Sequence, residues 1–63
     1  MEERLTLKQI RENKGVTQKH IYNLLGISRQ TLINKETGRT KFTALEVQKL
    51  CDEFGVSINE IRL

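Results

Sequence analysis

Proline and tryptophan are absent from the 63-residue chain, and its only Phe, Tyr or Trp side chains are two phenylalanines and one tyrosine. No stretch alternates strongly between apolar and polar residues, which is the pattern of a half-buried β-strand. Proline would interrupt helices, because it lacks a backbone N–H and its ring collides with the preceding turn. The lack of both features predicts a mainly helical fold.

The chain also has only one cysteine, Cys51, and no long apolar run. A single cysteine cannot form an intrachain disulfide or a multi-cysteine metal site, and it is compatible with a reducing compartment. The lack of a long apolar segment argues against a membrane span and a signal peptide. We therefore expect a cytoplasmic protein.

The residue sets that carry catalysis are missing as well. The sequence offers no evident pair of carboxylates, no glycine-rich phosphate loop and no Ser/His/Asp set. His20, the only histidine, lies beside an apolar stripe without a second base or metal ligand, and Cys51 is most simply a small core residue. We expect no enzymatic activity, no metal or other cofactor, and no small-molecule ligand.

Signals for helix ends recur along the chain. A chain of this length is expected to form one domain, residues 1–63, that buries only about 60% of its unfolded surface. Capping boxes begin at Thr6, Thr43 and Ser57, and a glycine, an apolar residue and Ser or Thr follow one another from residues 15, 26 and 55. Residues 1–5 carry no strong signal. The predicted helices span roughly residues 7–14, 18–25, 29–37, 44–54 and 58–62.

The most informative stretch is residues 17–38, where two predicted helices meet at Gly26-Ile27-Ser28. Glycine ends a helix readily because it adopts left-handed backbone angles, and the Ser hydroxyl can satisfy a free backbone N–H at the next helix start. Two helices joined by so short a corner must cross steeply. The stretch therefore predicts a helix-turn-helix.

The second helix of this motif has an unusual outward face. If Leu32 points inward, Gln30 and Asn34 lie almost opposite it, because successive residues turn by about 100°. Amide side chains both donate and accept hydrogen bonds, which matches the donor and acceptor that adenine presents in the major groove. An ordinary solvated face has the same appearance, so this helix alone does not decide between the two.

Positive charge is concentrated around the same helix. Four cations and one anion give residues 28–41 a net charge of +3, whereas residues 42–63 hold two cations and four anions, a net charge of −2. Residues 1–16 and 17–27 each carry +1, so the four segments sum to the +3 of the whole chain. A one-sided distribution of this kind is what a surface that binds a polyanion requires.

With these features in place, the chain resembles the phage repressor and Cro family of helix-turn-helix proteins, the Xre type, over about residues 7–61. The resemblance rests on residues that occur in register: Arg11, Gln18, Gly26, the run 28–32, the helix exit Glu36-Thr37-Gly38, and the run 54–57. It implies a compact all-α, five-helix lambda-repressor-like domain. The second and third helices would form the helix-turn-helix.

The resemblance also implies roles for individual residues, because family members dock the third helix in the major groove. Base contacts then fall on Ser28, Arg29, Gln30, Ile33 and Asn34. Phosphate contacts fall on Thr17, Gln18, Lys19, Thr37, Arg39 and Lys41. Arg11 and Glu36 take the positions of a partly buried structural ion pair.

Two residues depart from the family pattern. Tyr22 stands where family members usually have alanine, and Lys35 stands where many have a large apolar residue. We predict that the Tyr22 ring covers the aliphatic stem of Lys35 and replaces the missing apolar volume. The alternative is a changed crossing angle between the two helices, which would alter the set of outward residues that reach bases.

The predicted function is that of a sequence-specific, double-stranded DNA-binding transcriptional regulator, associated with the nucleoid. It is expected to be a weak homodimer that DNA strengthens on a pseudo-palindromic operator. The candidate dimer contacts are Leu45, Ile61 and Leu63. The alternative is a helical protein-interaction module, an adaptor or antitoxin-like partner, that keeps the fold without reading bases.

Overall fold

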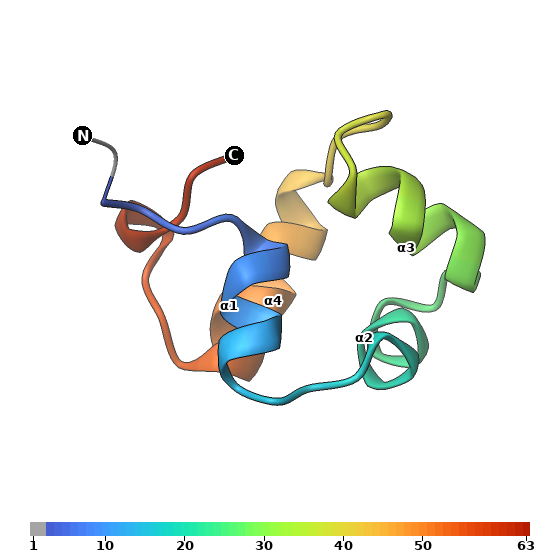
Figure 1. The fold of residues 1–63 in the computed structure, drawn as a ribbon, viewed down its shortest axis with the longest axis horizontal. Helices are drawn as coiled ribbons and strands as arrows, with labels where there is room; N and C mark the ends of the chain where they lie inside the picture. The colour runs from blue at the N-terminus through green and yellow to red at the C-terminus, as the bar shows by residue number, and fades with distance from the viewer. Residues whose placement is uncertain (1–2) are drawn as a thin grey trace.

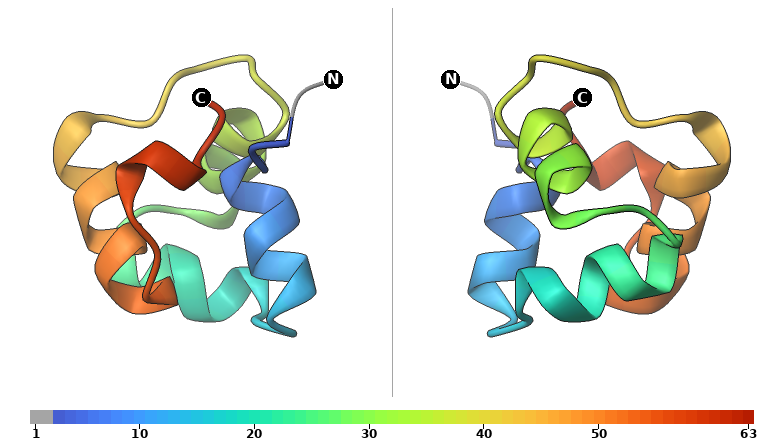
Figure 2. Two further views of the ribbon diagram at one scale, coloured as in Figure 1. Left: turned by 90° about the vertical axis from the view of Figure 1, so that its left-hand side faces the viewer. Right: turned by 90° about the vertical axis from the view of Figure 1, so that its right-hand side faces the viewer.

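A computed structural model describes residues 3–63 of the chain (Figure 1). Within this range the chain forms four α-helices, α1 (Leu7–Asn13), α2 (Gln18–Leu25), α3 (Arg29–Glu36) and α4 (Ala44–Phe54), followed by the short 3-10 helix η1 (Ile58–Glu60). α1 and α4 lie side by side, and α2 and α3 form the end of the molecule opposite the chain termini (Figures 1 and 2). The mainly helical prediction and the four α-helical segments are confirmed.

The predicted fifth helix, 58–62, is wrong. Only one 3-10 turn forms there, because Ile61 adopts extended backbone angles, φ −108° and ψ 134°. Ile61 forms a parallel β-bridge with Leu5, and the Arg62 N–H donates to the Leu5 carbonyl at 2.8 Å. Ile58, in this turn, is 59% exposed. Residues 3–5 thus hold the C-terminal segment in place; residues 1 and 2 lie outside the described range.

The helix ends follow the predicted capping chemistry. The hydroxyls of Thr6, Thr17, Ser28 and Thr43 each accept a hydrogen bond from the backbone N–H three residues later. At the motif corner, Gly26 has φ 69° and the Ile27 N–H donates to the Tyr22 carbonyl at 3.0 Å. This bond closes the end of α2 while Ile27 packs against the core, and only residues 26–28 separate α2 from α3.

One cluster of buried apolar side chains is shared by every α-helix. Its members in residues 3–63 are Leu7, Ile10, Ile21, Leu32, Val47, Leu50, Phe54 and Ile61. α3 contributes only Leu32, which is fully buried, whereas α4 contributes three residues. Apolar burial alone therefore fixes α3 at one point, and polar contacts must set its orientation.

The first polar contact joins α1, α2 and α3. Arg11 Nε lies 2.8 Å from Glu36 Oε2, and the side chains are only 10% and 4% exposed. Arg11 Nη1 also donates to the Val16 carbonyl at 2.9 Å, and Gln18 Nε2 donates to Glu36 Oε1 at 3.1 Å. The last residue of α3 is thereby tied to α1 and to the first residue of α2.

The second polar contact joins the end of α3 to α4. Lys35 Nζ lies 2.9 Å from Glu46 Oε1, donates to the Lys41 carbonyl at 3.1 Å, and lies 5.9 Å from the centre of the Phe42 ring. These contacts involve the ammonium, so the predicted cover of the Lys35 stem by the Tyr22 ring stays a prediction. The ammonium links the end of α3 to the loop 37–43 and to α4.

Removal of one partner of the Arg11–Glu36 pair is expected to be costly. Glu36→Ala leaves the Arg11 guanidinium largely buried without its carboxylate, and it should lower the free energy of unfolding by about 3 kcal/mol. The measurement is a denaturant or thermal unfolding curve, with Glu12→Ala, an exposed carboxylate of α1, as the control. A Glu36→Ala melting temperature within a degree or two of wild type would contradict this role.

Glu46 should make the fold sensitive to acid. Burial acts to raise the pKa of Glu46, but the hydrogen bond from the Thr43 backbone N–H and the nearby Lys35 ammonium outweigh it, so the pKa lies below its ordinary value of 4.5. The unfolded chain then binds this proton at a higher pH than the folded one. The contribution is full above pH 4.5 and is lost as the pH falls through the lower folded value.

Glu46→Gln tests this acid dependence. The stability difference between wild type and Glu46→Gln, measured by urea unfolding, should be largest near pH 7 and should shrink below pH 4.5. The difference between the two proteins isolates this carboxyl from the others. A difference that stays constant from pH 7 to pH 3, or grows on acidification, would show that the ion pair with Lys35 does not stabilise the fold.

Candidate nucleic-acid interface

The outward face of α3 is polar and structured. Leu32 anchors the opposite side of the helix in the core, while Gln30 is exposed and Asn34 is half-buried. Gln30 Nε2 donates a hydrogen bond to Asn34 Oδ1 at 3.1 Å, across one helical turn. The two predicted base-contact amides are therefore joined to each other, a link that the sequence analysis did not include.

Two hydroxyl side chains, those of Ser28 and Thr31, lie at the start of α3. Ser28 Oγ accepts from the Thr31 backbone N–H at 3.1 Å and lies 2.8 Å from the Thr31 hydroxyl. The Ser28 hydroxyl, predicted as a base contact, thus serves to begin the helix. Thr31, which the sequence analysis gave no contact role, adds a second hydroxyl to the same surface because it lies one turn after Ser28.

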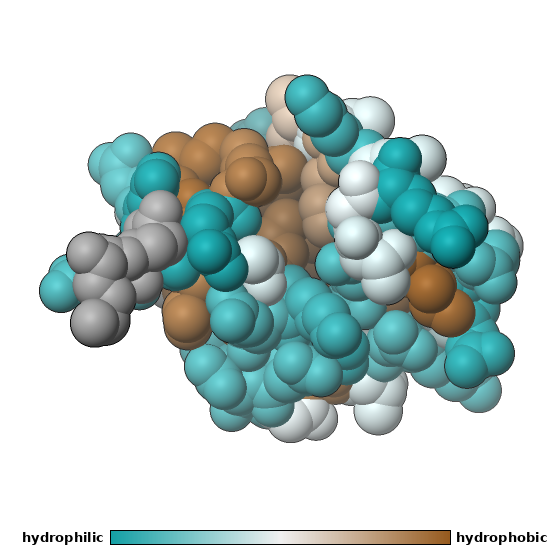
Figure 3. Space-filling model, turned by 45° about the horizontal axis from the view of Figure 1, so that its top comes forward, coloured by the Kyte–Doolittle hydropathy of each residue, from teal (hydrophilic) through white to brown (hydrophobic). Residues whose placement is uncertain are grey.

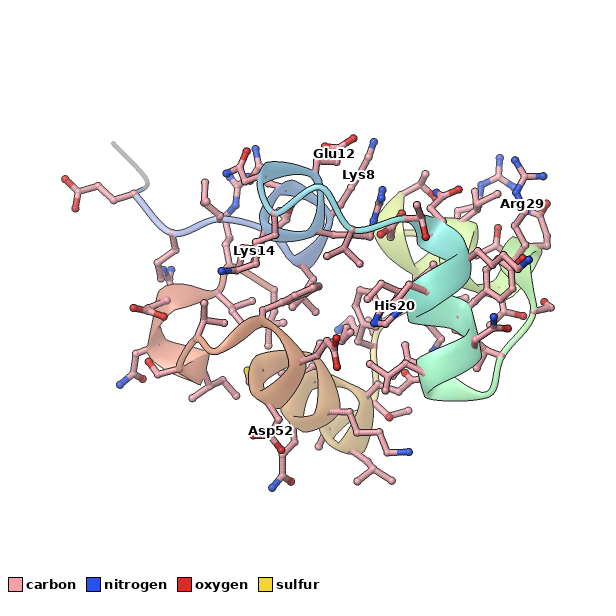
Figure 4. All side chains as sticks on the ribbon, turned by 90° about the horizontal axis from the view of Figure 1, so that it is seen from below. Lys8, Glu12, Lys14, His20, Arg29 and Asp52 are labelled. Carbon is pink, nitrogen blue, oxygen red and sulfur yellow. The ribbon has the colours of Figure 1, made fainter. Side chains whose placement is uncertain are left out.

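Four cations surround this face and are not used by the fold. The side chains of Lys19, Arg29, Arg39 and Lys41 are exposed and make no hydrogen bond or ion pair with any residue in 3–63. In Figure 4, Arg29 lies at the upper right, whereas Asp52 lies at the bottom, on α4. Three of the four, Arg29, Arg39 and Lys41, belong to the segment 28–41, whose net charge is +3.

The uncharged residues predicted to contact phosphate differ in what they can still donate. The Thr17 hydroxyl accepts from the His20 N–H at 3.1 Å, so its own proton stays free. Gln18 gives one N–H to Glu36, and its second N–H has no partner in the described chain. Thr37 already donates its proton to the Ile33 carbonyl at 2.8 Å, which leaves it no free donor.

His20 links α2 to α4 through an ion pair with Glu53. Its Nε2 is 2.8 Å from Glu53 Oε2, on an exposed part of the surface (Figure 4). No sequence signal pointed to this pair, because the two residues are 33 positions apart. The contact gives the helix-turn-helix a second attachment to α4, far from the outward face of α3.

The predicted dimer contacts divide into two kinds. Leu45 is 62% exposed and Leu63 is 80% exposed, so both can meet a partner. Ile61 is 2% exposed, and its prediction as a dimer contact is wrong because its bridge to Leu5 places the side chain in the core.

A hollow of about 530 Å³ lies beside the C-terminal residue, and hydrophobic side chains border it (Figure 3). It is lined by Lys35, Gly38, Thr40, Lys41, Phe42 and Leu63.

Two further kinds of functional feature, a membrane span and a metal cluster, were looked for in residues 3–63. No helix of residues 3–63 is long and apolar enough to cross a membrane. No three His, Cys, Asp or Glu residues of that range gather where they could hold a metal ion. Burial, with Asp52 and Glu60 nearby, raises the pKa of the half-buried Cys51 thiol above 9.0, which keeps it protonated at neutral pH.

Comparison with known proteins gave one match. Neither the curated proteins nor the solved structures contain a match to the chain. Among protein families, the model described as helix-turn-helix, of the Cro/C1 and Xre-like type, matches residues 7–61. That span includes all four α-helices and the exposed face of α3, and members of this family bind double-stranded DNA. The chain therefore belongs to the Cro/C1-type helix-turn-helix family of DNA-binding proteins.

Proposed function

We propose that this chain is a sequence-specific transcriptional regulator that docks α3 in the major groove of double-stranded DNA. The proposal rests on one observation: some residues of α3 contact the rest of the fold, and the others face outward. Its inward residue and its last two residues are engaged in the fold, whereas its outward amides and four surrounding cations are left for a partner. Double-stranded DNA fits this chemistry, because its phosphates attract cations and its base edges form hydrogen bonds with amides.

Base contacts are assigned to the exposed side of α3. Arg29 can give guanine two donors, and the amides of Gln30 and Asn34 suit adenine. Ile33, half-buried beside them, can meet a thymine methyl group. Ser28 is the weakest member of the predicted set, because its hydroxyl caps the helix.

Phosphate contacts are assigned mainly to Lys19, Arg39 and Lys41, whose side chains have no partner among residues 3–63 to give up. Thr17 and Gln18 can each add one donor at the start of α2, where free backbone N–H groups and the helix dipole also favour an anion. We omit Thr37 from the proposed set, because a phosphate contact would require its bond to Ile33 to break.

Two copies are proposed to bind one operator. One short helix covers only a few base pairs, whereas paired recognition helices about 34 Å apart enter successive major grooves on one side of the duplex. Leu45 and Leu63 are the exposed members of the predicted contact set, and two such side chains form a small interface. The dimer is therefore expected to be weak without DNA.

Two classes of variant should separate base reading from charge. Gln30→Ala should weaken binding to a site selected from random duplexes by about 1–3 kcal/mol and leave binding to random DNA nearly unchanged. Arg39→Ala and Lys41→Ala should weaken both equally, and each should reduce the salt slope by about one unit. Lys49→Ala, an exposed cation of α4 outside the proposed interface, is the charge-matched control.

The outcomes of this titration are distinct. Equal losses on selected and random duplexes for both classes of variant would contradict the assignment of α3 to base reading. A wild-type protein without a steep salt dependence on duplex DNA would instead favour the protein-interaction module. Lys49→Ala should match wild type, and a reduced slope for this variant would place the DNA on α4.

The dimer proposal predicts a change of assembly on DNA. Sedimentation at micromolar concentration should show a monomer or a weak dimer alone, and two protomers on a duplex with two half-sites. Leu45→Glu should reduce this cooperativity while it leaves binding to a single half-site intact. A tight dimer without DNA, or saturation of the two-half-site duplex by one protomer, would contradict the proposal.

A further inference from the structure

The geometry points to Gln30 and Asn34 as a single reading unit, in which Gln30 contacts adenine through two hydrogen bonds and Asn34 positions Gln30. This inference rests on the proposed docking of α3 in the major groove, and it narrows the base-contact set proposed above, because Asn34 now acts on the base only through Gln30. Gln30 is the residue that touches the base. Asn34 acts through Gln30 and is a positioning residue.

The Gln30 amide has enough hydrogen-bonding groups to bind adenine and Asn34 at the same time. A primary amide has two N–H donors, one on the same side as its oxygen and one on the other side. Adenine is contacted by the oxygen, which accepts from N6, together with the N–H on that same side, which donates to N7. The second N–H remains free for the bond to Asn34 Oδ1, observed at 3.1 Å. Adenine binding and the contact with Asn34 are therefore compatible.

Asn34 is held more firmly by the fold than Gln30 is. Gln30 is exposed and has a longer side chain, so in isolation it would sample many rotamers. Asn34 is half-buried, and its backbone carbonyl accepts from the N–H groups of Arg39 and Thr40 at 2.9 and 3.2 Å. The loop 37–43 thus holds the backbone of Asn34, and Asn34 in turn restricts Gln30 before DNA arrives.

The bond between Gln30 and Asn34 also affects the choice between adenine and guanine. Guanine presents two acceptors, O6 and N7, in the major groove. With one Gln30 N–H already given to Asn34, a guanine would leave the Gln30 oxygen facing another acceptor. The unit therefore selects adenine and disfavours guanine at one position of each half-site.

The test begins with duplexes selected from a random pool by the wild-type protein. Within the selected site, each adenine is replaced in turn by 7-deazaadenine, which lacks the N7 acceptor, and by purine, which lacks the N6 amino group. One adenine of each half-site should lose about tenfold or more in affinity with either analogue. Gln30→Ala should abolish the effect of both analogues at that adenine and nowhere else.

Asn34 variants then distinguish positioning from direct contact. Asn34→Ala should lower discrimination about three- to tenfold at the same base pair, and it should add nothing there once Gln30→Ala is present. Asn34→Asp keeps an oxygen acceptor for Gln30, so it should retain discrimination while its charge weakens selected and random duplexes alike. Gln48→Ala, an exposed amide of α4, is the control and should match wild type.

Three results would overturn the unit. The first is a loss for Asn34→Ala that maps to a different base pair from that of Gln30→Ala, and the second is additive losses in the double variant. The third is an Asn34→Asp protein that discriminates as poorly as Asn34→Ala. Failure of the proposed function itself has a separate signature, because the wild-type protein would then select no preferred sequence at all.

Discussion

The ion pair between Arg11 and Glu36 is the interaction on which the rest of the molecule depends. α3 places a single side chain in the core, and one apolar contact lets a short helix pivot. Glu36 removes that freedom, because its carboxylate accepts from Arg11 on α1 and from Gln18 on α2. Lys35 repeats the principle on the other side of the helix end, where Glu46 and the Lys41 carbonyl hold its ammonium. Both polar contacts lie at the C-terminal end of α3.

Because these two polar contacts hold α3 in place, its outward face is not needed for the fold and can bind another molecule. Residues that would otherwise help to bury the helix are polar and exposed, and the cations around them are unpaired within the described chain. The cost is a fold with little reserve, since small domains have only a few kcal/mol of stability. Loss of one polar contact therefore affects stability and the placement of the face together.

The sequence predicted most of the helices and their caps, because capping residues and glycine act locally. It predicted the partnership of Arg11 and Glu36 only through a family resemblance, since 25 positions separate them. It failed at the C-terminus, where a capping box at Ser57 starts only one turn and pairing of Ile61 with Leu5 prevails. It also missed the partners of Lys35, because contacts with Glu46 and the Lys41 carbonyl depend on how the loop 37–43 folds back.

The docking of α3 is tested most directly by a map of backbone amide resonances as a selected duplex is added to the ¹⁵N-labelled protein. We expect large shifts in residues 28–34 and 39–41, smaller ones at 17–19, and little change in residues 48–54 of α4. The amide resonances of Arg11 and Glu36 should keep their positions, because the ion pair between these residues is already formed before DNA binds. Shifts centred on residues 48–54, with α3 unaffected, would contradict docking through α3.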